Sequence, residues 1–176
     1  IYSGCTSETA ANFDPSANTD DGSCIFGPWG EIDIAESNHQ IAIPDYADLN
    51  FDGSPITLGD WIGVFYTGSD GELVCGGSIL WEGVTTNLAA WGSEAGVDNG
   101  FQAGEEYTWY IYDSETGQSI AASNITMSFG DNAYSCNGLS GLGSLEAFGV
   151  IPGCMDDEAY NYNPDDLSDW KFLQLQ

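Results

Sequence analysis

The sequence predicts an all-β protein built as a β-sandwich. Aromatic and β-branched runs alternate with clusters of turn residues, and the 23 glycines among 176 residues imply many tight turns. No apolar pattern of helical period and length lies between these runs. Because 42% of the residues are hydrophobic, the chain can bury a core in spite of its acidity.

Each predicted strand is an apolar or alternating run that ends at a turn signal such as Asp52-Gly53 or Asp98-Asn99-Gly100. In segment 107–112 both alternating faces carry aromatic or β-branched residues, which indicates a central strand covered on both sides. The predicted strands are 31–35, 39–43, 61–66, 73–81, 88–91, 107–112, 125–129 and 144–148.

The charge of the chain is almost entirely negative. It has 28 acidic residues, one lysine (Lys171) and no arginine. This balance excludes nucleic acid and anionic lipid as partners, and no apolar run approaches the ~18 residues of a membrane-spanning helix. Self-repulsion opposes folding, and divalent cations can offset it where basic side chains cannot. A surface adapted to high salt is the alternative explanation.

The two ends of the chain are related to each other. Segments 4–24 and 153–171 align without gaps, and the position of Cys24 falls on Leu173 in the second copy. We therefore predict a motif at 1–25, a β-sandwich domain at 26–150, and a partial second motif with an apolar tail at 151–176. The identical pairs are Gly4/Gly153, Cys5/Cys154, Ala10/Ala159, Asn12/Asn161, Pro15/Pro164 and Asp20/Asp169.

The first motif is predicted to hold a disulfide and a Ca²⁺ ion. Cys5 and Cys24 enclose a mostly polar loop that cannot build an apolar core, so a bond between them is expected to stabilise it. Hard oxygen donors at short spacing suit Ca²⁺, although a solvated acidic loop is the plainer interpretation. The predicted ligands are Asn12, Asp14, Asn18, Asp20 and Asp21, with Asp156, Asn161, Asn163 and Asp169 in the second copy.

These residues also carry a resemblance to a known class of module. The pattern Gly4-Cys5, Ala10-x-Asn12-Phe13-Asp14-Pro15 and Asp20-Asp21-Gly22-Ser23-Cys24 resembles a short motif that recurs between β-domains in secreted or cell-surface proteins of Bacteroidetes-type bacteria. Segment 30–145 resembles the domains found beside that motif, through Asn38-His39, the run 59–66, Cys75-Gly76-Gly77, Trp81, Ala90-Trp91-Gly92, Gly100-Phe101 and Gly104-Glu105. The resemblance implies calcium binding and a secreted, cell-surface location, and it brings no known activity.

A second calcium loop is a weaker prediction. Asp48, Asn50 and Asp52-Gly53 match the opening of an EF-type loop, but Gly59 stands where that loop needs a glutamate. The surrounding strands also favour a polar turn instead.

Cys75 and Cys136 are predicted to form a disulfide within the domain. A catalytic cysteine would need a histidine base, and the only histidine, His39, is distant in sequence and is expected to be structural. Paired carboxylates such as Glu105-Glu106 give little support for a hydrolase, so the chain is predicted not to be an enzyme. Asn124 opens a possible glycosylation sequon, Asn124-Ile125-Thr126.

The C-terminal tail is predicted to contact other copies of the chain. Segment 170–176 lacks acidic residues and alternates like a strand, so it could extend the sheet of a neighbour, although it could equally pack on its own domain. Cys154 has no internal partner by count. The residues of this predicted intersubunit contact are Cys154, Trp170, Phe172, Leu173 and Leu175.

Together these features predict a structural subunit of an extracellular, calcium-stabilised filament or surface adhesin that assembles head-to-tail with copies of itself or with neighbouring repeats. The alternative is a carbohydrate-binding module of a secreted multi-domain protein, in which exposed tryptophans would contact glycans. Trp61, Trp81, Trp91 and Trp109 would be the candidates, although core packing is the commoner role of such residues.

Overall fold

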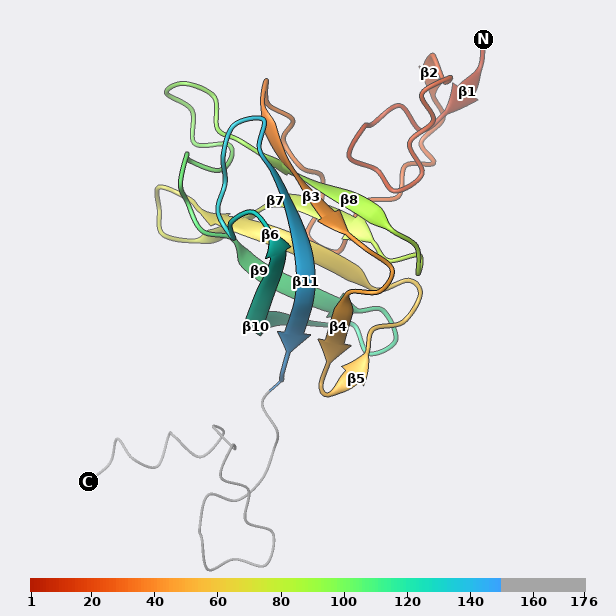
Figure 1. Ribbon diagram of the computed structural model, residues 1–176. Coiled ribbons are helices and arrows are strands. Elements are labelled where there is room, and N and C mark those ends of the chain that lie inside the picture. Colours follow the sequence, from red (N-terminus) through yellow and green to blue (C-terminus); the bar gives the residue numbers. More distant parts are fainter. Residues whose placement is uncertain (150–176) are drawn as a thin grey trace, which may run out of the picture.

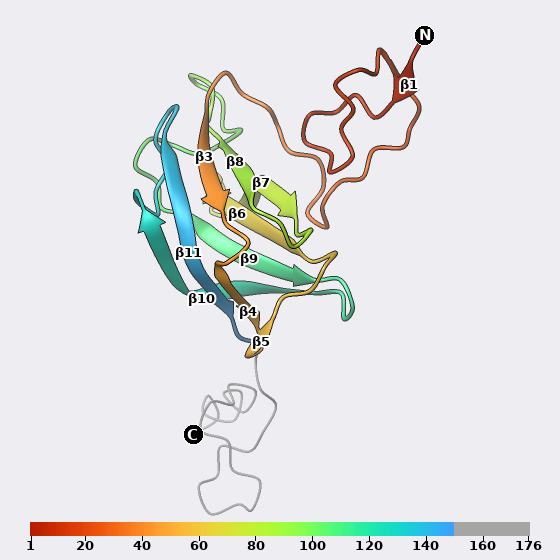
Figure 2. The ribbon, with the colours of Figure 1, turned by 45° about the vertical axis from the view of Figure 1, so that its right-hand side comes forward.

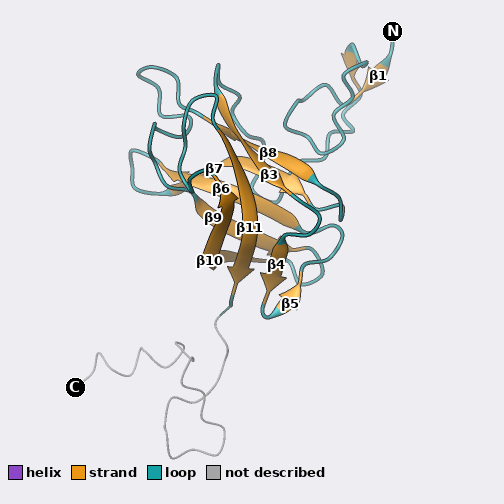
Figure 3. Ribbon diagram, viewed as in Figure 1, coloured by secondary structure: helices purple, strands orange, loops and turns teal. Residues whose placement is uncertain are grey.

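The computed structural model describes residues 1–149, and every regular element in that range is a β-strand (Figure 3). No helix among these residues is long and apolar enough to cross a membrane. The all-β prediction is therefore confirmed. The strands are β1 Ser3–Gly4, β2 Thr19–Asp20, β3 Asn38–Ile43, β4 Asp48–Phe51, β5 Ser54–Pro55, β6 Trp61–Thr67, β7 Leu73–Leu80, β8 Thr86–Trp91, β9 Thr108–Asp113, β10 Gln118–Phe129 and β11 Leu139–Ala147.

The large sheet is mixed and contains nine strands, with β5-β4-β11-β10-β9-β6-β7 as its main order. One edge of β11 pairs in parallel with β3 at its start and with β4 at its end. The long strand β10 pairs with β9 from Gln118 to Ala121. From Ala122 to Phe129 it pairs with β11, across several register shifts. It therefore joins the two halves of the sheet (Figures 1 and 2).

The sheet curls around one core, and its ends meet at β7 and β8. These strands lie side by side without backbone pairing, and a side chain added at Gly77 of β7 would collide with the backbone of Ala89 on β8. We call this line of contact the β7–β8 seam. The buried core residues are Ile41, Ile43, Leu49, Phe51, Ile62, Val64, Tyr66, Trp81, Leu88, Ala90, Phe101, Tyr107, Trp109, Ile111, Tyr134, Leu142, Leu145 and Ala147.

The outer face of β6 is covered by the segment that enters the domain. Trp29 packs edge-on against Phe65, with ring centroids 5.3 Å apart, and its ring occupies the space left open by Gly63. Its indole N–H donates to the Ser119 hydroxyl at 3.0 Å. As predicted, β9 lies between two strands, β6 and β10, with Trp109 and Ile111 in the core.

Several strand predictions differ from the structure, and the short strands β4 and β5 were not predicted. Segment 31–35 forms no strand: Ile32 and Ala35 are buried, but the backbone covers the outer face of the sheet without pairing. Strands β10 and β11 begin earlier than predicted, at Gln118 and Leu139. Their first residues are polar or rich in glycine, so the pairing partner rather than a hydrophobic pattern specifies them.

Candidate functional site

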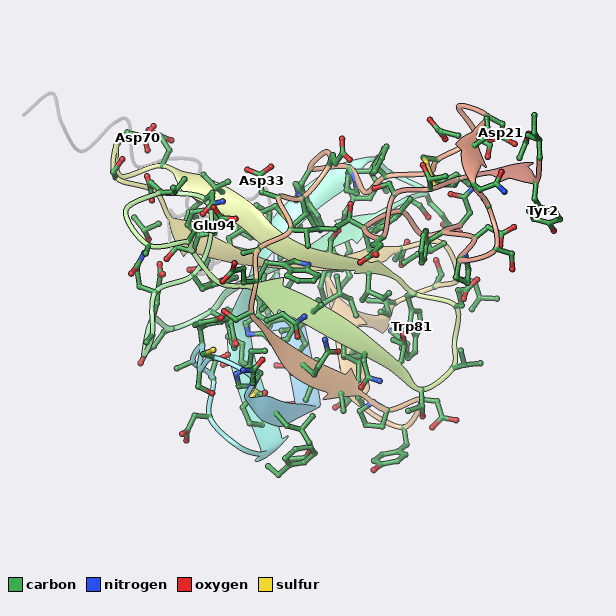
Figure 4. The ribbon with its side chains drawn as sticks, turned by 90° about the horizontal axis from the view of Figure 1, so that it is seen from above. Tyr2, Asp21, Asp33, Asp70, Trp81 and Glu94 are labelled. Carbon is green, nitrogen blue, oxygen red and sulfur yellow. A yellow bond between two sulfur atoms is a disulfide. The ribbon has the colours of Figure 1, made fainter. Side chains whose placement is uncertain are left out.

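The N-terminal motif, residues 1–25, forms a small unit beside the large sheet, and Tyr2 and Asp21 lie on it in Figure 4. Its two strands pair in parallel, with Ser3 opposite Thr19 and Gly4 opposite Asp20. The predicted disulfide is confirmed: Cys5 is bonded to Cys24, and Cys5 is almost fully buried. The Cys5 carbonyl also accepts the backbone N–H of Asp14 at 2.9 Å, so the loop folds back on its cystine.

The predicted calcium ligands of the motif shape its turns. Asn12 donates to the Ser23 carbonyl and accepts from the Ile25 N–H, both at 2.8 Å, which ties the loop to its exit. Asn18 accepts the Tyr2 N–H at 3.1 Å. These two amides therefore join the loop to the segments where the chain enters and leaves the motif.

The three aspartates of the motif each close a local turn. In each, one carboxylate oxygen accepts the backbone N–H of the residue two positions later. Asp14 accepts from Ser16, Asp20 from Gly22, and Asp21 from Ser23. Hydrogen bonds from the Ser23 side chain and backbone lower the pKa of Asp21, because they favour the charged carboxylate. Within residues 1–149 no three histidine, cysteine or carboxylate side chains converge as a ready-made metal site.

The weaker calcium candidates lie on a β-hairpin. Asp48 and Asn50 belong to β4 and bond to each other at 2.8 Å. Asp52 and Gly53 form the turn into β5, both with positive φ, which suits a tight hairpin. Asp52 also accepts the Gly149 N–H at 2.6 Å. These residues hold the chain where it leaves the sheet, and calcium binding by them stays a prediction.

The predicted disulfide between Cys75 and Cys136 is not formed, because the structure has both as free thiols. Cys75 lies on β7 and bonds to the Gly77 carbonyl, whereas Cys136 lies on the exposed loop between β10 and β11, in the other half of the sheet. Burial raises the pKa of the Cys75 thiol to about 11, so it stays protonated and unreactive.

His39 has the structural role predicted from the sequence and lies at the centre of a buried polar cluster, whose other members were not predicted. Its Nδ1 accepts the backbone N–H of Ser135 at 3.1 Å, and its Nε2 lies 3.0 Å from the hydroxyl of the fully buried Ser140. Because Nδ1 is an acceptor, Nε2 carries the proton. Burial lowers the pKa of His39, so the neutral imidazole holds the β10–β11 loop against β3 and β11.

Two tyrosines border this histidine. Tyr107 and Tyr134 lie 5.8 and 6.4 Å from the imidazole by ring centroid. The Tyr134 hydroxyl is 2.9 Å from that of Ser37. The Tyr107 hydroxyl is buried with no hydrogen-bond partner among residues 1–149, and burial raises its pKa. A buried hydroxyl without a partner costs free energy on folding.

Asp60 is a second buried polar group that sequence reasoning missed. One carboxylate oxygen accepts the Thr57 N–H at 2.7 Å and its hydroxyl at 3.2 Å. The other carboxylate oxygen accepts the backbone N–H and the hydroxyl of Ser114, each at 2.9 Å. With four donors satisfied, Asp60 joins the loop before β6 to the loop after β9. The spacing Thr57-x-x-Asp60 before a strand was the available signal.

The remaining candidates have structural surroundings. Glu105 accepts the backbone N–H groups of Thr67 and Gln102, at 2.8 and 2.9 Å, so it closes loops. Asn124 is exposed on β10, and its amide donates to Glu146 at 3.0 Å. Trp61, Trp81 and Trp109 are buried, while Trp91 is half-buried.

Several predicted residues lie outside the described range. They are Cys154, Asp156, Asn161, Asn163, Asp169, Trp170, Phe172, Leu173 and Leu175.

Comparison with protein-family models, with curated proteins and with solved structures gave no match.

Proposed function

We propose that this chain is a structural module of an extracellular surface assembly, a filament subunit or an adhesin repeat, whose N-terminal motif forms the junction with the preceding module. The observation that carries the proposal is the Cys5–Cys24 disulfide, which closes a polar loop at one end of the domain. Disulfides of this kind persist in oxidising compartments, which supports a secreted or cell-surface location.

The arrangement of the chain supports head-to-tail assembly. The N-terminal motif lies at one end of the molecule, and β11 ends at the opposite end (Figures 1 and 2). The apolar, acid-free segment 170–176 follows that strand in sequence. A tail that extends the sheet of the next copy gives contacts that do not close on themselves, and such contacts produce filaments. We interpret the curled sheet as a sandwich whose two layers share β10.

Calcium is proposed as the cation that stabilises the junction. Residues 1–149 contain no lysine or arginine, so no basic side chain there can neutralise the carboxylates. Asp14, Asp20 and Asp21 each accept one backbone N–H that closes a turn, and a carboxylate keeps further lone pairs that can bind a cation. The site would be completed by amide oxygens, backbone carbonyls and water, which Ca²⁺ accepts readily.

Negative-stain electron microscopy of the full chain tests this function. We expect filaments in calcium, their loss in EDTA and their return when calcium is restored. A variant with Leu173→Asp and Leu175→Asp should remain folded and monomeric, whereas Leu58→Asp, a change at an exposed leucine of the domain, should still polymerise. A monomer under every condition would contradict the assembly proposal.

A further inference from the structure

A cavity of about 130 Å³ lies between the N-terminal motif and the outer face of the large sheet. Its floor spans the β7–β8 seam, and residues 8–11 and Ile32 wall it from the side of the motif. Two modules of the chain therefore build it jointly, and neither could enclose it alone.

The alternation of side chains along the strands explains the lining. On β8, Leu88 and Ala90 are fully buried in the core, so Asn87 and Trp91 project from the outer face. On β7, Ser78 stands opposite Gly63 of β6, where the lack of a side chain leaves room for Trp29. The polar side chains that line the cavity therefore project from the outer face of the sheet, away from the core.

The cavity gathers hydrogen-bonding groups that have no partner. Among residues 1–149, the side chains of Glu8, Ser78 and Asn87 form no hydrogen bond. Within that range the indole N–H groups of Trp61 and Trp91 also have no acceptor, whereas those of Trp29 and Trp109 each donate to a side chain. A serine hydroxyl and an asparagine amide can each donate and accept. Aromatic rings beside such groups are typical of ligand sites with a few convergent polar contacts.

We propose that this cavity binds one ring of a neutral saccharide. Sugar hydroxyls both donate and accept, as Ser78 and Asn87 do, and the C–H face of a pyranose packs on indole. Pockets for drug-sized ligands measure about 300–1,000 Å³, so a cavity of about 130 Å³ suits a smaller ligand, no larger than a single ring. The acidic chain and Glu8 at the cavity repel uronic and sialic acids.

The test is saturation-transfer NMR on the full, oxidised chain with methyl glycosides of glucose, galactose, mannose and N-acetylglucosamine. A ligand of about a dozen heavy atoms should bind with Kd on the order of 1 mM. Glucuronate should not bind. Asn87→Ala, a change at an exposed residue, should weaken binding about tenfold, whereas Asn124→Ala on β10 should leave it unchanged.

Either of two results would overturn the proposal: no transfer to any neutral glycoside, or equal binding by the Asn87→Ala variant. Loss of the cystine offers a second check, because reducing Cys5–Cys24 releases one wall of the cavity and should abolish binding. Filament formation does not enter this experiment, so the two proposals fail or survive separately.

Discussion

The buried imidazole of His39 makes the stability of this protein sensitive to mild acid. Protonation at Nδ1 would replace an acceptor with a donor that faces the Ser135 N–H, 3.1 Å away. Most groups around the ring are neutral: Ser140 and Ser135 are hydroxyls, and Tyr107 and Tyr134 are phenols. The one carboxylate nearby, Asp131, lies with Cys136 on the exposed loop. Burial therefore disfavours the charged form in the folded state and lowers the pKa of His39, and the hydrogen bond with Ser135 offsets part of that effect.

The direction of the pH effect follows from the lowered pKa of His39. The unfolded chain binds a proton near pH 6.5 and the folded chain only at lower pH. The contribution of neutral His39 to the free energy of unfolding is therefore fully present above pH 6.5. It is lost as the pH falls from 6.5 through the pKa that His39 has in the folded state. One proton changes the free energy of unfolding by at most about 1.4 kcal/mol per pH unit.

Urea unfolding between pH 7.5 and pH 5 measures this slope, and the His39→Gln variant supplies the baseline set by the carboxylates. We expect the difference between the two proteins to shrink below pH 6.5 as the wild type weakens. Because the chain has one histidine, its Hε1 resonance in proton NMR reports the folded pKa directly. A folded pKa of 6.5 or above would refute the reasoning.

Three further changes test the remaining buried contacts. Tyr107→Phe removes a hydroxyl without a partner and should raise the free energy of unfolding by up to ~1 kcal/mol, whereas Tyr134→Phe breaks the bond to Ser37 and should lower it by about 1 kcal/mol in the same urea assay; equal effects would contradict the assignment. Asp60→Asn replaces a carboxylate that accepts four hydrogen bonds and should lower the free energy of unfolding by about 2–4 kcal/mol. A decrease below ~1 kcal/mol, measured by thermal unfolding, would show that the two loops stay in place without this carboxylate. Cys5→Ser with Cys24→Ser removes a constraint of about 3 kcal/mol on a loop of this length; hydrogen exchange should rise in residues 1–25 and stay unchanged at β9, and unaltered protection of the motif would contradict the role given to the cystine.

Strands with a strong local sequence pattern were predicted correctly. Strand β6 combines apolar residues with a preceding turn, and the Cys5–Cys24 loop combines polar composition with flanking cysteines, so both were found. Segment 31–35 has the same alternation as a strand, yet it pairs with no strand, and its Ile32 lines the cavity that Trp61 also lines. The choice between pairing and covering depends on which strand edges are free, which local pattern does not encode.

The polar clusters could not be predicted because their partners are distant in sequence. His39 meets Ser135 and Ser140, and Asp60 meets Ser114, only after the sheet has curled. The Cys75–Cys136 disulfide was predicted from cysteine count and flanking residues, which carry no information on which half of the sheet holds each thiol. Topology decides such contacts.

Calcium dependence of stability tests the central proposal most directly. The oxidised chain, stripped of metal at low ionic strength, should gain about 2.7 kcal/mol in free energy of unfolding when Ca²⁺ reaches 100 times its Kd. A variant with Asp20→Asn and Asp21→Asn should gain much less, and sodium at matched ionic strength should not reproduce the effect. Thermal unfolding that does not shift with Ca²⁺, or that shifts equally in the variant, would contradict the account.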